Sequence, residues 1–288
     1  MKIRSVYDVL KDSVAVFRQS KGPLLGAALA FYTTLSLSPL LLVIVAIAGA
    51  VYGEDAARGQ IFFQIRDLVG DDGAKTIESM LAATQSQHHG WIATLVSVVT
   101  VVIAATGVFA NLQEALDAIW GLRPEQIRGG ILLAIRDRAV AFSVVCGMAI
   151  LLIASLIATT LLSGFSASLD DWVPGAAMWL RVGNVAISFL VIATFFAILF
   201  KFLPHTIVPW AGVGIGAGIT SLLFTIGKEL IGFYLGKAAV GSPYGAAGSF
   251  VALLMWIYYS AQIFLLGAAI TRVVAQRSGL ARPEITPR

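Results

Sequence analysis

The protein has 288 residues, of which 58% are apolar and only 12% are charged, whereas an ordinary soluble domain carries about 25% charged residues. So little charge cannot cover a core of that size, which excludes a water-soluble globule. The composition also excludes a disordered chain, and the single cysteine excludes a disulfide scaffold. We therefore expect a membrane to be the main solvent of this chain.

Six apolar stretches are each long enough to cross a membrane, because a helical crossing needs about 20 apolar residues. They run approximately over residues 24–52, 91–110, 139–163, 179–203, 210–235 and 249–271. Continuous apolar runs favour helices over a barrel, since a helix satisfies its own backbone groups in hydrocarbon. We predict an all-α integral membrane protein, a bundle of six transmembrane helices within residues 24–272.

Lys and Arg residues are distributed unevenly among the connections, 14 in one alternating set and four in the other. The richer set comprises residues 1–23, 111–138, 201–209 and 272–288, and the poorer set comprises residues 53–90, 164–178 and 236–248. Because cytoplasmic connections are enriched in Lys and Arg, we predict that both termini are cytoplasmic, with residues 273–288 as a tail. This topology accounts for the net charge of +4 without a nucleic-acid partner.

Residues 1–23 are patterned as an amphipathic helix on the cytoplasmic leaflet. One predicted face carries apolar residues and the remainder carries basic ones; the apolar residues are Val6, Val9, Leu10, Val14 and Phe17, and the basic ones are Lys2, Arg4, Lys11 and Arg18. We expect no cleavable signal, because the first apolar run is far longer than the 7–15 residues typical of a signal core.

The connection over residues 53–90 shows two weak helical periods separated by a Gly-Asp-Asp-Gly turn. We predict a helical outer cap. Asp71 and Asp72 lack the alternating ligands of a calcium loop, so we interpret them as a solvated turn and expect no metal site.

The first span carries an unusually polar run that ends at Pro39. Proline removes a backbone hydrogen bond, so we expect a kink or break, with Ser or Thr hydroxyls and neighbouring helices compensating. Ser36, Ser38 and Pro39 are the hinge candidates of this span. Gly26, Ala30, Thr34 and Ser38 form a stripe of small residues suited to close helix contact. Two interpretations stay open: packing around a structural kink, or a hinge that lines a substrate path.

The fifth span has a second stripe of small residues, formed by Gly212, Gly216 and Thr220, with Gly214 and Gly218 interleaved. We expect this helix to pack tightly and to bend easily. Gly212 and Gly216 are therefore further hinge candidates.

Charged and polar residues gather near the predicted outer ends of the fourth and fifth spans. The cluster comprises Arg181, Asn184, Ser188, Lys228 and Glu229. An unpaired charge at membrane depth costs at least about 2.5 kcal/mol, so we expect Arg181 to pair with Glu229 while Lys228 snorkels. The pair is either a structural bridge or part of a site for an anionic substrate or a lipid headgroup.

Polar residues also gather at the predicted inner side. Asn111, Gln113, Glu114 and Asp117 end the second span, and four arginines follow before the third. We interpret most of them as cytoplasmic connectors that face water or lipid phosphates, with a selective site as the alternative. In the last span, Gln262 is expected to bond to another helix.

Three segments together resemble the YihY/BrkB family of bacterial inner-membrane proteins, whose older label is ribonuclease BN-like. Residues 28–41 read ALAFYTTLSLSPLL, residues 111–120 read NLQEALDAIW, and residues 244–268 begin with YGAAG, contain LMWIY and end with LGA. The resemblance implies a protein of the bacterial inner membrane that moves something across or within it. One departure is Ala269, where many relatives carry an acidic residue.

The residues do not support the ribonuclease label or a metal-dependent hydrolase. His88 and His89 are predicted to lie across the membrane from His205, so no clustered ligand set can form from them. We also expect no paired acid and base at one depth, which argues against an intramembrane hydrolase. No catalytic residue and no cofactor is predicted.

The sequence thus favours a non-enzymatic, multi-pass inner-membrane protein that transports or translocates a small anionic solute or a lipid. The alternative is a non-catalytic protein that organises the bacterial envelope. Membrane lipids are the expected partners, and self-association into a homo-oligomer is left open.

Overall fold

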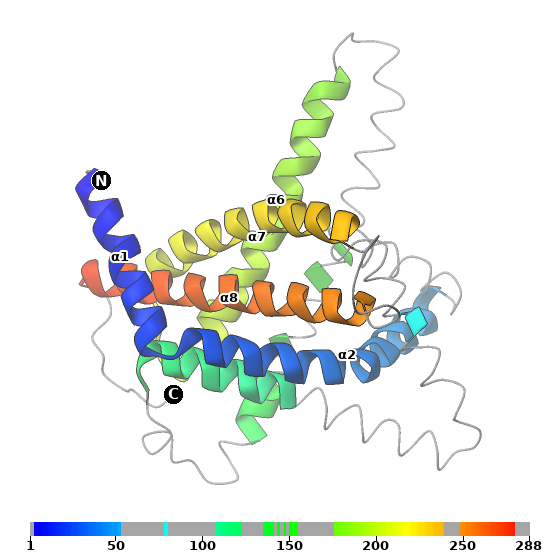
Figure 1. Cartoon of the computed structure of the whole chain (residues 1–288), viewed down its shortest axis with the longest axis horizontal. Coiled ribbons are helices and arrows are strands. Elements are labelled where there is room, and N and C mark those ends of the chain that lie inside the picture. The colour runs from blue at the N-terminus through cyan, green and yellow to red at the C-terminus, as the bar shows by residue number, and fades with distance from the viewer. Residues whose placement is uncertain are drawn as a thin grey trace. The chain divides into compact units, whose positions relative to one another are not determined.

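The computed structural model describes residues 3–52, 78–79, 107–122, 135–140, 143–144, 147, 150–151, 153–154, 176–238 and 248–279. The predicted outer cap and most of the second and third predicted spans lie outside these residues. The long helices are α1 (Ile3–Gln19), α2 (Gly22–Tyr52), α6 (Ala176–Phe202), α7 (Trp210–Ala238) and α8 (Gly248–Arg277), shown in Figure 1. Residues 107–120 and 135–140 are also helical, and the described part contains no strand. The all-α class is confirmed there.

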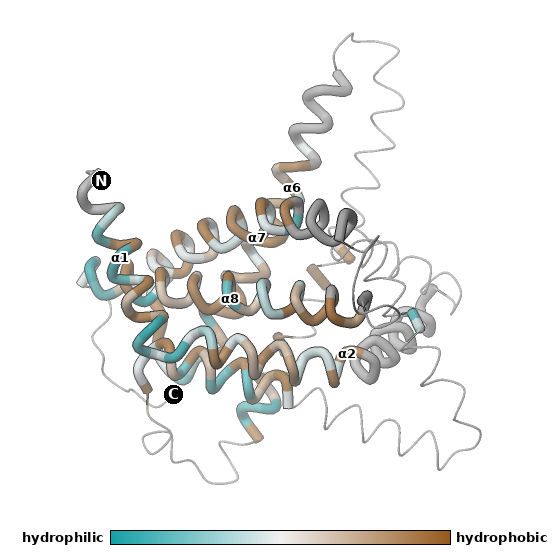
Figure 2. Tube along the Cα trace, viewed as in Figure 1, coloured by the Kyte–Doolittle hydropathy of each residue, from teal (hydrophilic) through white to brown (hydrophobic). Residues whose placement is uncertain are grey.

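Three of the described helices are long and apolar enough to cross a membrane. The stretches are Val185–Phe202 of α6, Trp210–Lys228 of α7 and Leu253–Arg277 of α8, and α2 adds a shorter apolar stretch over Gly22–Leu37. Figure 2 shows α8 as mainly hydrophobic, whereas α1 mixes hydrophilic and hydrophobic residues along its length. The six-span count remains a prediction.

The outward faces of these helices carry large apolar side chains that would be poorly placed in water. Examples are Val185, Leu190, Leu222, Leu230 and Met255, each 49–64% exposed. Isolated apolar residues are common on soluble surfaces, but rows of them along helices of this length match a lipid-facing surface.

The chain divides into two compact units, residues 1–20, 116–225 and 266–288 in the first and residues 21–115 and 226–265 in the second. In the second unit, α2 packs through its predicted stripe of small residues. Ala30 and Thr34 are 2% exposed, and Gly26 faces the side chain of Gln262 on α8. Gln262 donates a long hydrogen bond of 3.4 Å to the Pro23 carbonyl, which confirms its predicted contact with another helix. The stripe is confirmed at Gly26, Ala30 and Thr34, and the side chain of Ser38 lies outside the described part.

In the first unit, α7 and α8 are in contact through glycines that face threonines. A Cβ atom at Gly216 would collide with Thr271, and one at Gly267 would collide with Thr220. Each threonine donates its Oγ1 hydrogen to its own helix, Thr220 to the Gly216 carbonyl at 2.6 Å and Thr271 to the Gly267 carbonyl at 2.9 Å. We call this contact the Gly–Thr seam; it buries both hydroxyl groups without leaving a polar group unpaired.

The predicted stripe on α7 is therefore the packing face of the Gly–Thr seam. A Cβ atom at Gly212 would press on the α8 backbone at 3.0 Å, whereas nothing lies within 4 Å of the corresponding positions at Gly214 and Gly218. The close approach of the two helix backbones explains the glycine at position 212. It does not explain the glycines at positions 214 and 218.

Helix α1 packs across the C-terminal end of α8, as Figure 1 shows. Val9 forms a small core with Ile270, Val273 and Val274 of α8, and Val16 packs against this core. Ser13 is fully buried and donates to the Val9 carbonyl at 2.7 Å. Helix α8 covers only the part of the predicted apolar face that carries Val9, and Leu10 and Val14 on the same face stay exposed.

Candidate functional site

The helix over residues 107–120 ends in a turn that fixes the position of Asp117. Gly121 adopts a positive φ of 79°, its N–H donates to the Ala118 carbonyl at 3.1 Å, and the Leu122 N–H donates to the Asp117 carbonyl at 2.9 Å. This is the Schellman pattern, in which a left-handed residue satisfies the last helix carbonyls. Glycine is favoured there because a Cβ atom is strained at positive φ.

A side chain from α8 completes the end of this helix. Arg272 donates from Nη1 to the Ile119 carbonyl at 2.6 Å. A cation at a helix C-terminus also interacts favourably with the helix dipole. The guanidinium lies close to Gly121, where a Cβ atom would come within 3.3 Å of both terminal nitrogens, so the left-handed glycine leaves room for the arginine.

His205 lies in the connection between α6 and α7 and joins two carboxylates. Its backbone N–H donates to Asp117 Oδ1 at 2.9 Å, and its ring Nδ1 lies 2.6 Å from Asp117 Oδ2. On the other side of the ring, Nε2 lies 3.1 Å from Asp137 Oδ1. The Asp117 side chain is 5% exposed, the His205 side chain 18% and the Asp137 side chain 28%. We call these three residues the inner cluster.

The connection that carries His205 is itself well held. Lys201, near the end of α6, donates from Nζ to the Val208 carbonyl at 2.5 Å and lies 5.3 Å from the centre of the Trp210 ring. The Phe202 and Trp210 rings meet edge to face at 6.4 Å. A short connection closed in this way presents the imidazole from a fixed position.

The two carboxylates favour the charged form of His205. The pKa of His205 is raised above its ordinary value, chiefly because Asp117 accepts a hydrogen bond from the ring. Burial opposes this shift, and the negative charges of both carboxylates add to it. The imidazolium can donate from both ring nitrogens, which matches the placement of one carboxylate at each nitrogen.

This geometry corrects one expectation and limits the chemistry of the cluster. We expected no acid and base at one depth, and that expectation is wrong for His205, which meets Asp117 and Asp137. Both ring nitrogens face carboxylates, so the ring is not directed at a nucleophile as a general base would be. Among the residues that the structure describes, no group of three or more His, Cys, Asp or Glu residues is placed to hold a metal ion.

The predicted outer cluster is only partly described. All five residues lie on α6 or α7. The Ser188 side chain is exposed and the Lys228 side chain is half-buried, whereas the side chains of Arg181, Asn184 and Glu229 lie outside the described part. The expected pairing of Arg181 with Glu229 stays a prediction.

The hinge candidates lie within continuous helices. α2 remains helical through Ser38 and Pro39, and the buried Ser36 donates from Oγ to the Thr33 carbonyl at 3.1 Å. Gly212 and Gly216 lie in the Gly–Thr seam. Their role as hinges stays a prediction.

Sequence reasoning named Asp117 as an inner polar residue but missed its partners. Asp117 falls between apolar residues, Leu116 and Ile119, that are fully buried, and this spacing indicates an inward position on the helix. His205 follows Pro204 in a connection between two predicted spans. Asp117 and His205 both lie in connections predicted on the same side of the membrane. This shared side was the only feature of the sequence from which the pair could have been predicted.

The family model described as Virulence factor BrkB matches residues 13–288. The chain belongs to this family. The resemblance to the YihY/BrkB family, inferred from three short segments, is thereby confirmed over nearly the whole chain.

Curated relatives of the BrkB-family chain are described as UPF0761 membrane proteins. One from Methylibium petroleiphilum is 29% identical over 91% of this chain and 61% of its own length, and one from Ralstonia nicotianae is 28% identical over 86% and 54%. One from Actinobacillus pleuropneumoniae is 25% identical over 86% of this chain and 87% of its own length. The chain thus spans between half and two thirds of the first two relatives. No solved structure matches it.

Family membership and the apolar helices together establish a helical membrane protein. Ala269 is fully buried in α8. A carboxylate at that position would be surrounded by core side chains, where a charge is costly to bury.

Proposed function

We propose that this BrkB-family chain transports or translocates a small anionic solute or a lipid, and that the inner cluster controls the opening of its cytoplasmic end. The observation that carries the proposal is the His205 imidazole held between Asp117 and Asp137. Three titratable groups from three separate segments form a contact whose strength depends on proton concentration.

If stability were the only requirement, a buried charged contact would have no advantage over apolar residues of similar volume. Removing ions from water costs several kcal/mol for each ion, and well-packed apolar residues often give equal or greater stability. A contact that must form and break during transport has a different requirement, because protonation can change its strength under physiological conditions. The near-complete burial of Asp117 beside an exchangeable proton fits this requirement.

The location of the cluster also supports a role at one end of the protein. The segments that carry it, residues 111–138 and 201–209, belong to the basic set of connections predicted on the cytoplasmic side. Asp12 of α1 and Arg277 of α8 form an ion pair of 2.5 Å, which supports a position of α1 and the end of α8 on one side of the membrane. We propose that this side is the cytoplasmic face of a bacterial inner membrane.

The anionic character of the cargo rests on the outer cluster. Arg181 and Lys228 are basic residues within predicted spans, and intramembrane ionisable residues commonly mark a substrate path. We propose that Arg181 and Glu229 contact the cargo at the outer side and that the chain catalyses no chemical step.

Flux measurements with the purified full-length protein in liposomes test this function. The probes are radiolabelled orthophosphate for a solute and fluorescent phosphatidylglycerol for a lipid, and protein-free liposomes are the control. We expect one probe to move faster with wild-type protein, Arg181→Ala and Glu229→Ala to abolish that movement, and His205→Gln to alter its pH dependence. Normal flux in both outer variants would remove the proposed site. Failure of both probes, together with stable copurifying envelope proteins, would favour the assembly role.

A further inference from the structure

Helix α1 has an apolar edge that the first unit leaves uncovered. Tyr7, Leu10 and Val14 are 68%, 46% and 43% exposed. They project within about 60° of one another at 3.6 residues per turn. The edge is distinct from the side that carries Val9 and Val16, which packs on α8.

The charges on α1 are arranged asymmetrically around this edge. Lys11 and Arg18 are exposed and project within about 40° of Tyr7, whereas Asp8 and Asp12 project roughly 100–140° from it. Arg277 of α8 neutralises Asp12 through the 2.5 Å ion pair. The strip beside the exposed apolar residues is therefore basic.

The contact with α8 places α1 at the depth of a membrane interface. Val9 and Val16 pack against Ile270, Val273 and Val274, which lie in the last turns of the candidate span Leu253–Arg277. A helix that crosses the end of a span lies where acyl chains give way to headgroups.

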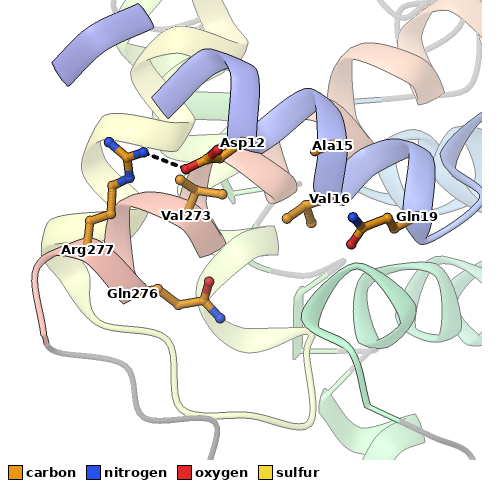
Figure 3. Close-up of a pocket in the computed structure, with 7 residues that line it drawn as sticks. All are labelled: Asp12, Ala15, Val16, Gln19, Val273, Gln276 and Arg277. Atoms are coloured by element: carbon orange, nitrogen blue, oxygen red, sulfur yellow. Dashed lines mark hydrogen bonds and ion pairs between the residues drawn. The ribbon is translucent and has the colours of Figure 1, made fainter. Parts of the chain in front are cut away.

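A third side of α1, which carries Asp12 and Gln19, borders a pocket. The pocket lies between α1 and α8 and has a volume of about 410 Å³. Figure 3 shows the ion pair of Asp12 and Arg277 at one end of it and Gln19 and Gln276 along its rim. The apolar contact of α1 with α8 runs through the row of side chains that includes Val9 and Val16. The exposed apolar edge of α1 is not part of this contact, so only a second surface can bury it.

We propose that the exposed edge of α1 binds an anionic lipid leaflet, with Tyr7, Leu10 and Val14 among the acyl chains and Lys11 and Arg18 at the phosphates. This surface goes beyond the proposed transport function and does not depend on it. Among apolar surfaces, an anionic leaflet is the one that also matches the adjacent basic strip, since basic residues on amphipathic helices are attracted to acidic headgroups.

Depth measurements on the full chain test this proposal. In a Cys146→Ser background, which removes the single cysteine, Leu10→Cys or Val14→Cys carries an environment-sensitive fluorophore. The vesicles contain phosphatidylcholine with or without phosphatidylglycerol, together with spin-labelled lipids as quenchers. We expect strong quenching at both positions in the vesicles that contain phosphatidylglycerol. Asp8→Cys on the polar side is the matched control and should remain weakly quenched.

The charge dependence separates the lipid from other occupants. In phosphatidylglycerol vesicles, Lys11→Gln with Arg18→Gln should lower the ratio of bound to detached α1 by roughly 30-fold, which corresponds to about 1 kcal/mol for each basic residue. Lys11→Arg with Arg18→Lys should retain binding. Equal quenching at positions 8 and 10 would overturn the proposal. Efficient Leu10→Cys cross-linking between two copies would also overturn it, by identifying a second chain as the occupant.

Discussion

The Gly–Thr seam and the inner cluster hold the first unit together by different physical means. In the seam, threonine side chains fill the space above glycines, and each buried hydroxyl bonds within its own helix. In the inner cluster, a histidine joins two carboxylates from separate segments. The seam depends on shape and contains no titratable group, whereas the cluster depends on charge. Changes in pH should therefore act on the cluster and leave the seam unchanged.

The largest expected effect comes from removing the central acid of the inner cluster. Asp117→Ala leaves the His205 ring without its main partner, and breaking a buried pair on one side costs about 3 kcal/mol or more. Thermal unfolding of the purified protein in detergent, followed by tryptophan fluorescence, measures the loss. Glu114→Ala, a nearby acid on the same helix that is more exposed, is the matched control. Equal stability of the two variants would show that the cluster contributes little.

Overfilling the seam should have the next largest effect. In Gly216→Leu the new side chain collides with Thr271, and overpacking of this kind costs about 2 kcal/mol. Gly214→Leu on the open side of the same helix should be nearly neutral, because nothing lies within 4 Å of its Cβ position. The same unfolding measurement at pH 6 and pH 9 should give equal losses for Gly216→Leu. If the loss of stability in Gly216→Leu changed with pH, the Gly–Thr seam would not be independent of charge, and its distinction from the inner cluster would be wrong.

The arginine that caps the helix over residues 107–120 should have a smaller effect. Arg272→Gln removes the charged hydrogen bond to the Ile119 carbonyl, which is worth about 1.5 kcal/mol. Arg272→Lys restores the positive charge without the planar group and should recover part of the loss. If Gln and Lys destabilise the protein equally, the geometry of the guanidinium matters more than its charge.

The smallest and most specific effect concerns pH. Because the folded pKa of His205 is raised, its stabilising contribution is fully present below the unfolded value of about 6.5 and is lost as pH rises through the folded pKa. The difference in melting temperature between wild type and His205→Gln should therefore be largest near pH 6 and shrink toward pH 9. A constant difference across this range would show that the ring acts by packing alone.

Composition and periodicity were sufficient to predict the helical membrane class and the two stripes of small residues, because both depend on local spacing. The inner cluster was not predictable in the same way. His205 and Asp117 are 88 positions apart, and no periodic pattern relates a connection to a helix end. The division of α1 into a covered and an uncovered apolar side also depended on the position of α8, which a single helical wheel does not contain.

The order of residues along the Gly–Thr seam fixes how α7 and α8 can move. Gly216 faces Thr271 and, one turn later, Thr220 faces Gly267. Sliding one helix by a single turn of about 5.4 Å would bring threonine against threonine in one direction, where the side chains clash. In the other direction it would bring glycine against glycine, where a gap opens. The two helices are thus confined to one longitudinal alignment and should travel as a single rigid pair during any conformational cycle.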